Sequence, residues 1–312
     1  MGMINRPIIA EIAPNTYHIN EFGVDCQYLL IGEERALLID TGTGLYDVKK
    51  TVETLTDKPY DVVVTHMHGD HNGGSDQFET VWMHPEDIAL VPGARAMGDP
   101  EAVRRKLQRM EEMKTVGHYE TGTFGYNWPR YDHIFPYETL ERIVPEQSTV
   151  YQPLQDGQVF ELGKRPVTVY HTPGHTPGSV SLLDHKRRIL FAGDAMNSNV
   201  GTRSVGGAYS GVAVSTMLRG LLRIQAMRDQ YDQTFTGHVA YANTVDIFSQ
   251  PAFVLDDVIE NLRRLLNGTA EIIQMPSHLK PELVMPTAIY RTAATIFNPD
   301  LLWEEGEEHI VP

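Results

Sequence analysis

The segment His66-Met67-His68-Gly69-Asp70-His71 places three imidazoles and one carboxylate within six residues. It directly follows the short apolar run 60–65 (YDVVVT), which fits a buried strand. A neutral imidazole suits zinc and similar borderline metals, and an aspartate adds a harder oxygen ligand. The glycines at positions 69, 73 and 74 allow a tight turn that faces these side chains to two adjacent points. The pattern therefore predicts a strand that ends at a site for a divalent transition metal.

Three later segments each carry one more residue of a metal-binding type. His175 stands in HTPGHTPGS, Asp194 stands in LFAGDA after a strand, and His238 stands in TGH. With the four segments in this order, the chain resembles the metallo-β-lactamase superfamily, whose signature is His-X-His-X-Asp-His after a strand of an αββα sandwich. The resemblance runs from about residue 17 to residue 238 and is weakest at 85–147. It implies an α/β fold, an αββα sandwich of the metallo-β-lactamase type, with a helical and aromatic insertion.

The resemblance also implies a dinuclear metal centre. It assigns seven ligands to two metal ions: His66, His68 and His175 to the first, Asp70, His71 and His238 to the second, and Asp194 as a bridge between them. Asp40, in LLIDTG, matches a family motif too, and we expect it to support a ligand or to form a turn, because ligating histidines usually donate their other N–H to such a partner. Zinc is the first expectation for both ions. Manganese, iron and cobalt stay open, because binding follows metal availability as well as ligand type.

Two metal ions that share a hydroxide supply a nucleophile at neutral pH, because binding lowers the pKa of water to about 7. One ion also polarises a carbonyl or phosphoryl oxygen, and the other stabilises the developing charge. We expect Asp70 to be the catalytic residue that orients the hydroxide and collects its proton. The chain is therefore predicted to be a dinuclear metal-dependent hydrolase.

Several ligand positions narrow the reaction. Asp194 argues against classical β-lactam hydrolysis, because the resemblance would then require Cys or Ser at that position. His68 differs from the Glu that flavin-linked di-iron members carry in the first motif. The complete set is similar to that of glyoxalase II-like thioesterases, N-acyl homoserine lactonases and some phosphodiesterases. Lactonases typically carry a Tyr three residues after the bridging Asp, where this chain has Asn197, although Tyr209 could supply a donor instead.

We expect hydrolysis of a small ester-like bond, a lactone or a thioester in preference to a phosphodiester. Two alternatives stay open: a mononuclear iron oxidoreductase that resembles persulfide dioxygenases, and a phosphodiesterase or β-lactam hydrolase of the same fold. His71 and His238 complete the second metal site and therefore favour the hydrolase.

The rest of the chain reads as strands and helices around one long interruption. Strands are predicted at TYHIN, CQYLLIG, ALLIDTG, STVYQPL, QVFEL, VTVYHT, SVSLLD and RRILFAG, and helices at 46–55, 100–116, 212–228 and 252–266, the last ended by Gly268. An insertion is expected at about 85–147, and its aromatic residues Phe124, Trp128 and Phe135 are candidates, with Tyr209, to contact the substrate. We predict a catalytic domain at 1–270 and a C-terminal extension at 271–312 that packs on the domain or on a partner subunit.

The composition of the chain limits which classes of partner and which cellular compartment are expected. The net charge of −15 would repel a phosphate backbone, so no nucleic-acid substrate is expected. No apolar run approaches the roughly 18 to 20 residues of a membrane span, and no secretory signal is visible, so we expect a cytoplasmic protein without membrane contact. Cys26 is the only cysteine, which excludes an internal disulfide. A small-molecule substrate and a possible homodimer complete the expectation.

Overall fold

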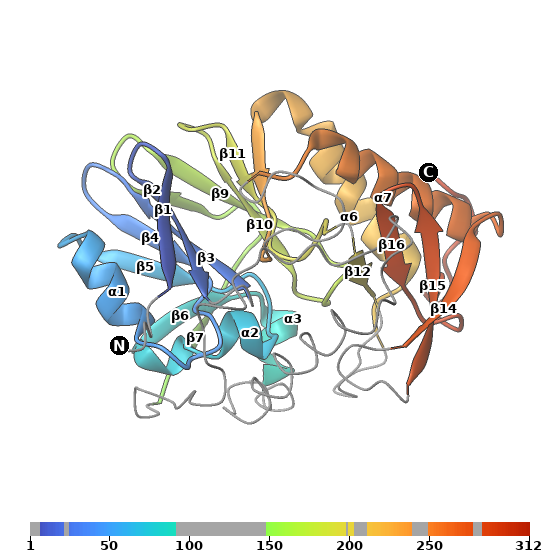
Figure 1. Ribbon diagram of the computed structural model, residues 1–312, viewed down its shortest axis with the longest axis horizontal. Coiled ribbons are helices and arrows are strands. Elements are labelled where there is room, and N and C mark those ends of the chain that lie inside the picture. Colours follow the sequence, from blue (N-terminus) through green and yellow to red (C-terminus); the bar gives the residue numbers. More distant parts are fainter. Residues whose placement is uncertain are drawn as a thin grey trace, which may run out of the picture.

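Two β-sheets packed face to face form the centre of the protein in the computed structural model, and helices cover their outer faces (Figure 1). The structure describes residues 7–21, 25–91, 148–197, 199–202, 211–238, 249–276 and 283–312. The predicted helix at 100–116 and the candidate substrate contacts Phe124, Trp128, Phe135 and Tyr209 lie outside these residues. No helix among the described ranges is long and apolar enough to cross a membrane.

The first sheet has seven strands in the order of the chain. They are β1 (Ile8–Ala13), β2 (Thr16–Glu21), β3 (Asp25–Ile31), β4 (Ala36–Ile39), β5 (Tyr60–Val63), β6 (Thr80–Met83) and β7 (Val150–Pro153). Neighbours are antiparallel up to β4 and parallel from β4 to β7. The central strand β4 is buried along its whole length, which explains its unbroken apolar sequence ALLI.

The second sheet has five strands in the order β13-β11-β10-β9-β8. Their bounds are β8 (Val159–Glu161), β9 (Pro166–His171), β10 (Val180–Asp184), β11 (Ile189–Phe191) and β13 (Gln233–Phe235). Strand β10 is antiparallel to both β9 and β11, and β11 is parallel to β13. Strands β9, β11 and β13 therefore run in one direction, and the loops that follow them leave the sheet at the same edge.

The two sheets meet in an apolar layer with an aromatic centre. The Tyr28 ring of β3 lies 4.9 Å from that of Phe191 in β11 and 5.8 Å from that of Phe235 in β13, measured between ring centroids. The Tyr28 hydroxyl donates a hydrogen bond of 2.6 Å to the carbonyl of Thr236. This bond ties the first sheet to the turn that leads into His238.

Helices cover both outer faces of this pair of sheets, so the layers follow the order α–β–β–α. Helix α1 (Val48–Leu55) packs Val48 and Val52 on the first sheet, and α6 (Val214–Ala226) and α7 (Ala252–Leu266) pack on the second. Short helical turns complete the fold: α2 (Gly69–Asn72), η1 (Ser75–Gln77), α3 (Pro85–Ile88) and η4 (Arg228–Gln230). The predicted fold class is confirmed.

The helix ends show how local chemistry sets the boundaries. Helix α7 covers the predicted range 252–266, and Thr269 beyond Gly268 donates its N–H to the Arg264 carbonyl at 2.8 Å. Helix α1 begins at Val48, two residues later than predicted, because the Asp47 carboxylate caps it by accepting the Lys50 N–H at 2.8 Å. Helix α6 also begins two residues later than predicted and ends two residues earlier.

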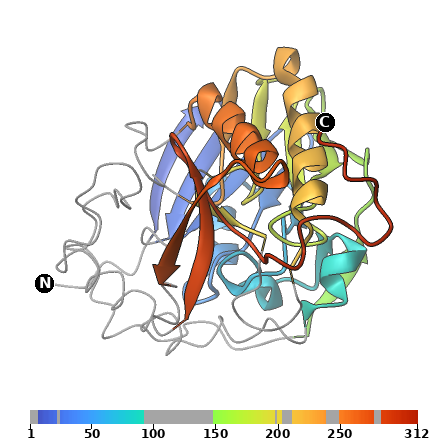
Figure 2. The same ribbon diagram turned by 90° about the vertical axis from the view of Figure 1, so that its right-hand side faces the viewer.

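The C-terminal segment forms strands that the sequence analysis did not predict. Strands β14 (Glu271–Pro276), β15 (Val284–Tyr290) and β16 (Ala293–Ile296) join β12 (Asn199–Gly201) in a third sheet, against which α7 packs. Pro286 interrupts the sequence pattern within β15, and Pro276 is the last residue of β14. Figure 2 shows the last residues running along α6, where the N–H of Val214 donates to the Leu301 carbonyl at 3.2 Å. The domain boundary at residue 270 stays a prediction.

Arg165 joins the two sheets at one end of the sandwich. Its side chain is 1% exposed, and its Nη2 donates to Asp184 Oδ2 in β10 and to Thr16 Oγ1 in β2, each at 2.6 Å. Its Nη1 donates to the carbonyls of Asn15 and Ile31 at 2.7 and 2.9 Å. One guanidinium thus satisfies groups of both sheets away from water.

We expect Arg165→Met to lower the free energy of unfolding by about 3–5 kcal/mol, because it leaves the Asp184 carboxylate buried without its partner. Urea denaturation measures this loss. The matched control is Arg188→Met, which removes an exposed ion pair with Asp232 and should change stability little. An equal loss in the two variants would contradict the role given to Arg165.

Candidate metal centre

All seven predicted ligands meet at one edge of the sandwich, because each follows the end of a strand. His66, His68, Asp70 and His71 follow β5 and continue into α2. His175, Asp194 and His238 follow β9, β11 and β13, the strands of the second sheet that share one direction. The site therefore lies where loops from both sheets face each other.

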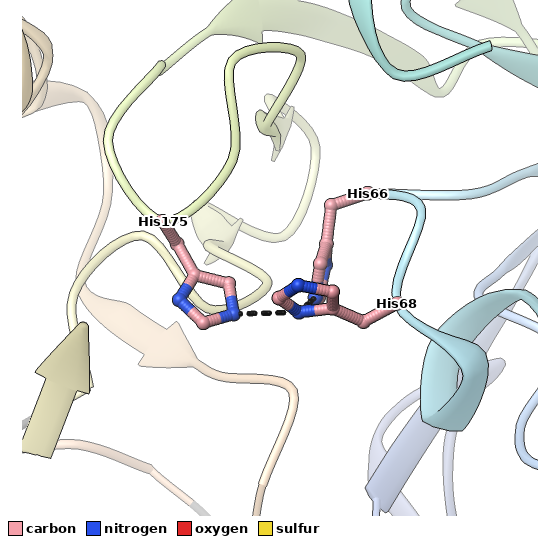
Figure 3. Close-up of side chains that lie close together, drawn as sticks. All are labelled: His66, His68 and His175. Atoms are coloured by element: carbon pink, nitrogen blue, oxygen red, sulfur yellow. Dashed lines mark hydrogen bonds between the residues drawn. The ribbon is translucent and has the colours of Figure 1, made fainter. Parts of the chain in front are cut away.

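His66, His68 and His175 form the first group (Figure 3). His68 Nδ1 lies 3.1 Å from His66 Nε2 and 2.9 Å from His175 Nε2. Burial, with a smaller contribution from neighbouring histidines, lowers the pKa of all three, and the pKa of His68 falls to about 3. The group therefore consists of neutral imidazoles whose nitrogens converge.

Hydrogen bonds on the far sides of the rings fix their tautomers. His175 Nδ1 donates to the Gly201 carbonyl at 3.0 Å. The Thr65 hydroxyl donates to Asp40 Oδ2 at 2.9 Å and lies 3.1 Å from His66 Nδ1, which therefore donates to it. The Nε2 lone pairs of His66 and His175 consequently face the centre of the group.

Asp70, His71 and His238 form the second group. His71 Nε2 lies 3.4 Å from His238 Nε2, which lies 3.9 Å from Asp70 Oδ2. His71 Nδ1 donates to Asp40 Oδ2 at 3.0 Å, so Asp40 supports ligands of both groups. This contact agrees with the supporting position that the sequence assigned to Asp40.

Asp194 lies between the two groups. Its Oδ2 is 3.0 Å from His238 Nε2 and 3.5 Å from His175 Nε2, and its Oδ1 is 3.7 Å from His71 Nε2. Burial opposes its charge, yet His238 and His71 outweigh burial and hold the pKa of Asp194 well below its usual range. In return, burial lowers the pKa of His71 but Asp194 and Asp40 raise it to about 9 overall.

These residues fit a pair of divalent metal ions. Asp194 Oδ1 is buried and accepts no hydrogen bond, as expected of a carboxylate oxygen that is reserved for a cation. The converging neutral imidazoles of the first group have too few protons to satisfy one another's lone pairs. Nitrogen and carboxylate oxygen together form a donor set for zinc or a similar transition metal. Which metal binds, and how many ions, stays a prediction.

Close packing at the site depends on Gly237, in the TGH segment. A Cβ at this position would lie 2.5 Å from both Asp194 Oδ1 and the His71 ring. A side chain here would displace ligands of the second group. This requirement for glycine is not visible in the sequence, because it depends on neighbours that are distant along the chain.

Two buried acids beside the ligands, Glu21 and Asp25, were not predicted from the sequence. Glu21 and Asp25 are fully buried, and burial raises the pKa of both carboxyl groups. Thr43 N–H donates to Glu21 at 2.7 Å and Gln27 Nε2 donates to Asp25 at 2.6 Å. Nothing in the segment EFGVD distinguishes these acids from surface charges, because their burial depends on the loops that cover them.

A further cluster of potential ligands, His84, Glu86 and His171, lies beside the site. The two rings are stacked, with centroids 3.9 Å apart and planes inclined by 12°. A ligating imidazole keeps its metal close to its own ring plane, so two nearly parallel stacked rings do not point to one ion. We interpret this contact as packing between α3 and β9.

The family model for the metallo-beta-lactamase superfamily matches residues 23–238. Acyl-coenzyme A thioesterase MBLAC2 of Homo sapiens is 32% identical over 181 residues, which are 54% of this chain and 57% of that protein. Hydroxyacylglutathione hydrolase GloC of Haemophilus influenzae is 23% identical over 186 residues, 60% of this chain and 71% of that protein. The match thus spans little more than half the length of the human thioesterase.

The fold is also found in solved structures. A metallo-beta-lactamase family protein of Thermus thermophilus superposes with a TM-score of 0.51 and 21% identity, over 83% of this chain and 82% of that chain. This likeness concerns the fold alone.

We expect Asp40→Ala to weaken metal binding by roughly 10- to 100-fold, because His71 and Thr65 lose the carboxylate that orients them. Competition with a chromophoric chelator measures the affinity. Asp61→Ala, which removes a surface carboxylate paired with Arg35, is the control and should leave the affinity unchanged. Unchanged affinity in Asp40→Ala as well would show that Asp40 supports no ligand.

Proposed function

This chain belongs to the metallo-β-lactamase superfamily, and from that membership we propose that it is a metal-dependent hydrolase whose substrate is a small thioester. The observation that carries the proposal is the pair of ligand groups joined by Asp194, because this arrangement suits a two-metal hydrolytic site. The human relative is named an acyl-coenzyme A thioesterase, which supports the thioester.

The proposal assigns the seven ligands as two triads and a bridge. His66, His68 and His175 would hold one metal ion, Asp70, His71 and His238 a second, and Asp194 both. When bound, such ions lower the pKa of a water molecule and polarise the carbonyl oxygen of the substrate.

We assign the transfer of the water proton to residues of the chain itself. Asp70 is buried at the start of α2, within 3.9 Å of His238, and we assign it to orient the attacking water and to accept its proton. The low pKa of Asp194 keeps that carboxylate ionised, so it does not act as an acid. Asp40 accepts a hydrogen bond from His71 Nδ1, and this bond would keep the His71 ring in its orientation during the reaction.

The leaving group favours a thioester over a lactone. A thiol has a pKa of about 8.5, so a thiolate departs without being protonated, whereas a lactone expels a far more basic alkoxide that needs a proton donor. The position three residues after Asp194 is Asn197, a buried amide that cannot give up a proton as a tyrosine can. The described ligand loops therefore suit a substrate that needs a proton acceptor alone.

Metal analysis with a substrate panel tests this proposal. The purified protein should carry close to two metal ions per chain, and His175→Ala and His238→Ala should each lose one. With zinc, manganese, iron or cobalt supplied, an uncharged acyl thioester should be hydrolysed with a higher kcat/KM than a lactone, a phosphodiester or a β-lactam. A single iron ion, with oxygen uptake on a persulfide, would instead support the oxidoreductase.

We expect Asp70→Asn to lower kcat by about 10²- to 10⁴-fold in metal-replete protein, because an amide keeps the shape of the carboxylate but accepts no proton. Steady-state thioester hydrolysis and metal content are measured on the same sample. Asp57→Asn, an exposed carboxylate after α1, is the matched control. A metal-replete Asp70→Asn protein with nearly the parent rate would show that Asp70 is a ligand without a catalytic part.

A further inference from the structure

Asp87, in the short helix α3, contacts both loops that carry the first histidine triad. Its side chain is fully buried. Oδ2 accepts the Met67 N–H at 2.8 Å and the Thr176 hydroxyl at 2.8 Å, and Oδ1 accepts the Gly178 N–H at 2.7 Å. One carboxylate is thus bound by three donors, all of them in the ligand loops.

Two of these donors are direct neighbours of the predicted metal ligands in the sequence. Met67 lies between His66 and His68, and Thr176 directly follows His175. The first loop leaves β5 in the first sheet, and the second leaves β9 in the second sheet. Asp87 therefore bridges the two sheets at the place where the three histidines converge.

The loop after β9 is shaped to bring its backbone against this carboxylate. A Cβ at Gly178 would lie 2.7 Å from both the nitrogen and Oδ1 of Asp87, closer than side chains approach in folded proteins. The loop is also braced internally, since Thr176 N–H donates to Ser179 Oγ at 3.0 Å. The close approach thus requires glycine at position 178 and fixes the distance between Asp87 and the His175 loop.

We propose that Asp87 is a positioning residue for the first metal ion, a role that rests on the metal binding assigned under the proposed function. By holding Met67 and Thr176 on one oxygen, it sets the spacing between His66, His68 and His175 before the metal binds. Preorganised ligands bind more tightly, because less order remains to be imposed on binding. Asp87 would act on the first triad, as Asp40 acts on His71 in the second.

Zinc titration in a His238→Ala background tests the proposal, because only the first triad then binds with high affinity. Asp87→Ala should weaken zinc binding roughly 10- to 100-fold. Asp87→Asn keeps one acceptor oxygen and should weaken it less. Gly178→Ala should reproduce the loss while leaving the carboxylate in place, because the added Cβ separates Asp87 from the His175 loop. Glu86→Ala removes the exposed neighbouring carboxylate of α3 and is the control.

Two further measurements separate positioning from a general loss of stability. Urea denaturation of the metal-free variants gives their stability, and the visible spectrum of the cobalt-loaded proteins reports the ligand geometry of the first triad. A changed cobalt spectrum with weakened zinc binding in Asp87→Ala and Gly178→Ala supports the proposal. Reduced stability with the zinc affinity and cobalt spectrum of the background protein would overturn it. A parent protein that binds no metal would instead overturn the proposed function, and this inference with it.

Discussion

Neutral imidazole nitrogens about 3 Å apart, with their lone pairs facing one another, do not hold themselves in place. Neighbouring residues must therefore fix the rings through hydrogen bonds to their other nitrogens, and most of the described contacts of the site have this effect. The Gly201 carbonyl fixes His175, the Thr65 hydroxyl fixes His66, and Asp40 fixes His71. The carboxylates that take part in this support are buried, and each accepts hydrogen bonds from the ligand loops.

The two ends of the sandwich differ: buried contacts make one end rigid, and the other end carries the candidate metal centre. At one end, Arg165 satisfies carbonyls and carboxylate of both sheets, and between the sheets the Tyr28 ring packs on Phe191 and Phe235. At the other end, strands that run in the same direction are followed by loops. The side chains that meet there lie on these separate loops and share no helix or strand. Loops supported by a rigid scaffold in this way are where proteins place catalysis. The Tyr28 hydroxyl links the two regions, because its acceptor is the carbonyl of Thr236, two residues before His238.

The proposed hydrolysis needs a proton acceptor more than a donor, the part assigned to Asp70. Asp194 stays ionised between the triads, and the histidines of the first triad stay neutral. A thioester suits such a site, since its leaving group departs as an anion. The strongly negative charge of the chain adds no attraction for an anionic thiol carrier, which is why an uncharged thioester is the sharper probe.

The seven candidate ligands could be named from the sequence, because His66 to His71 follow a recognisable strand and the later segments complete the resemblance to the metallo-β-lactamase superfamily. The sequence also determined helix α7, whose apolar periodicity and terminal glycine are local signals. Strands β14 to β16 were not predicted, although only β15 carries a proline in its interior, and neither were the parts played by Asp87 and Gly237. Those depend on contacts between residues far apart in the chain: Asp87 reaches Gly178, and Gly237 adjoins His71. These parts become visible only in the folded chain, because a buried carboxylate and a surface carboxylate have the same letter in the sequence and differ only in what surrounds them.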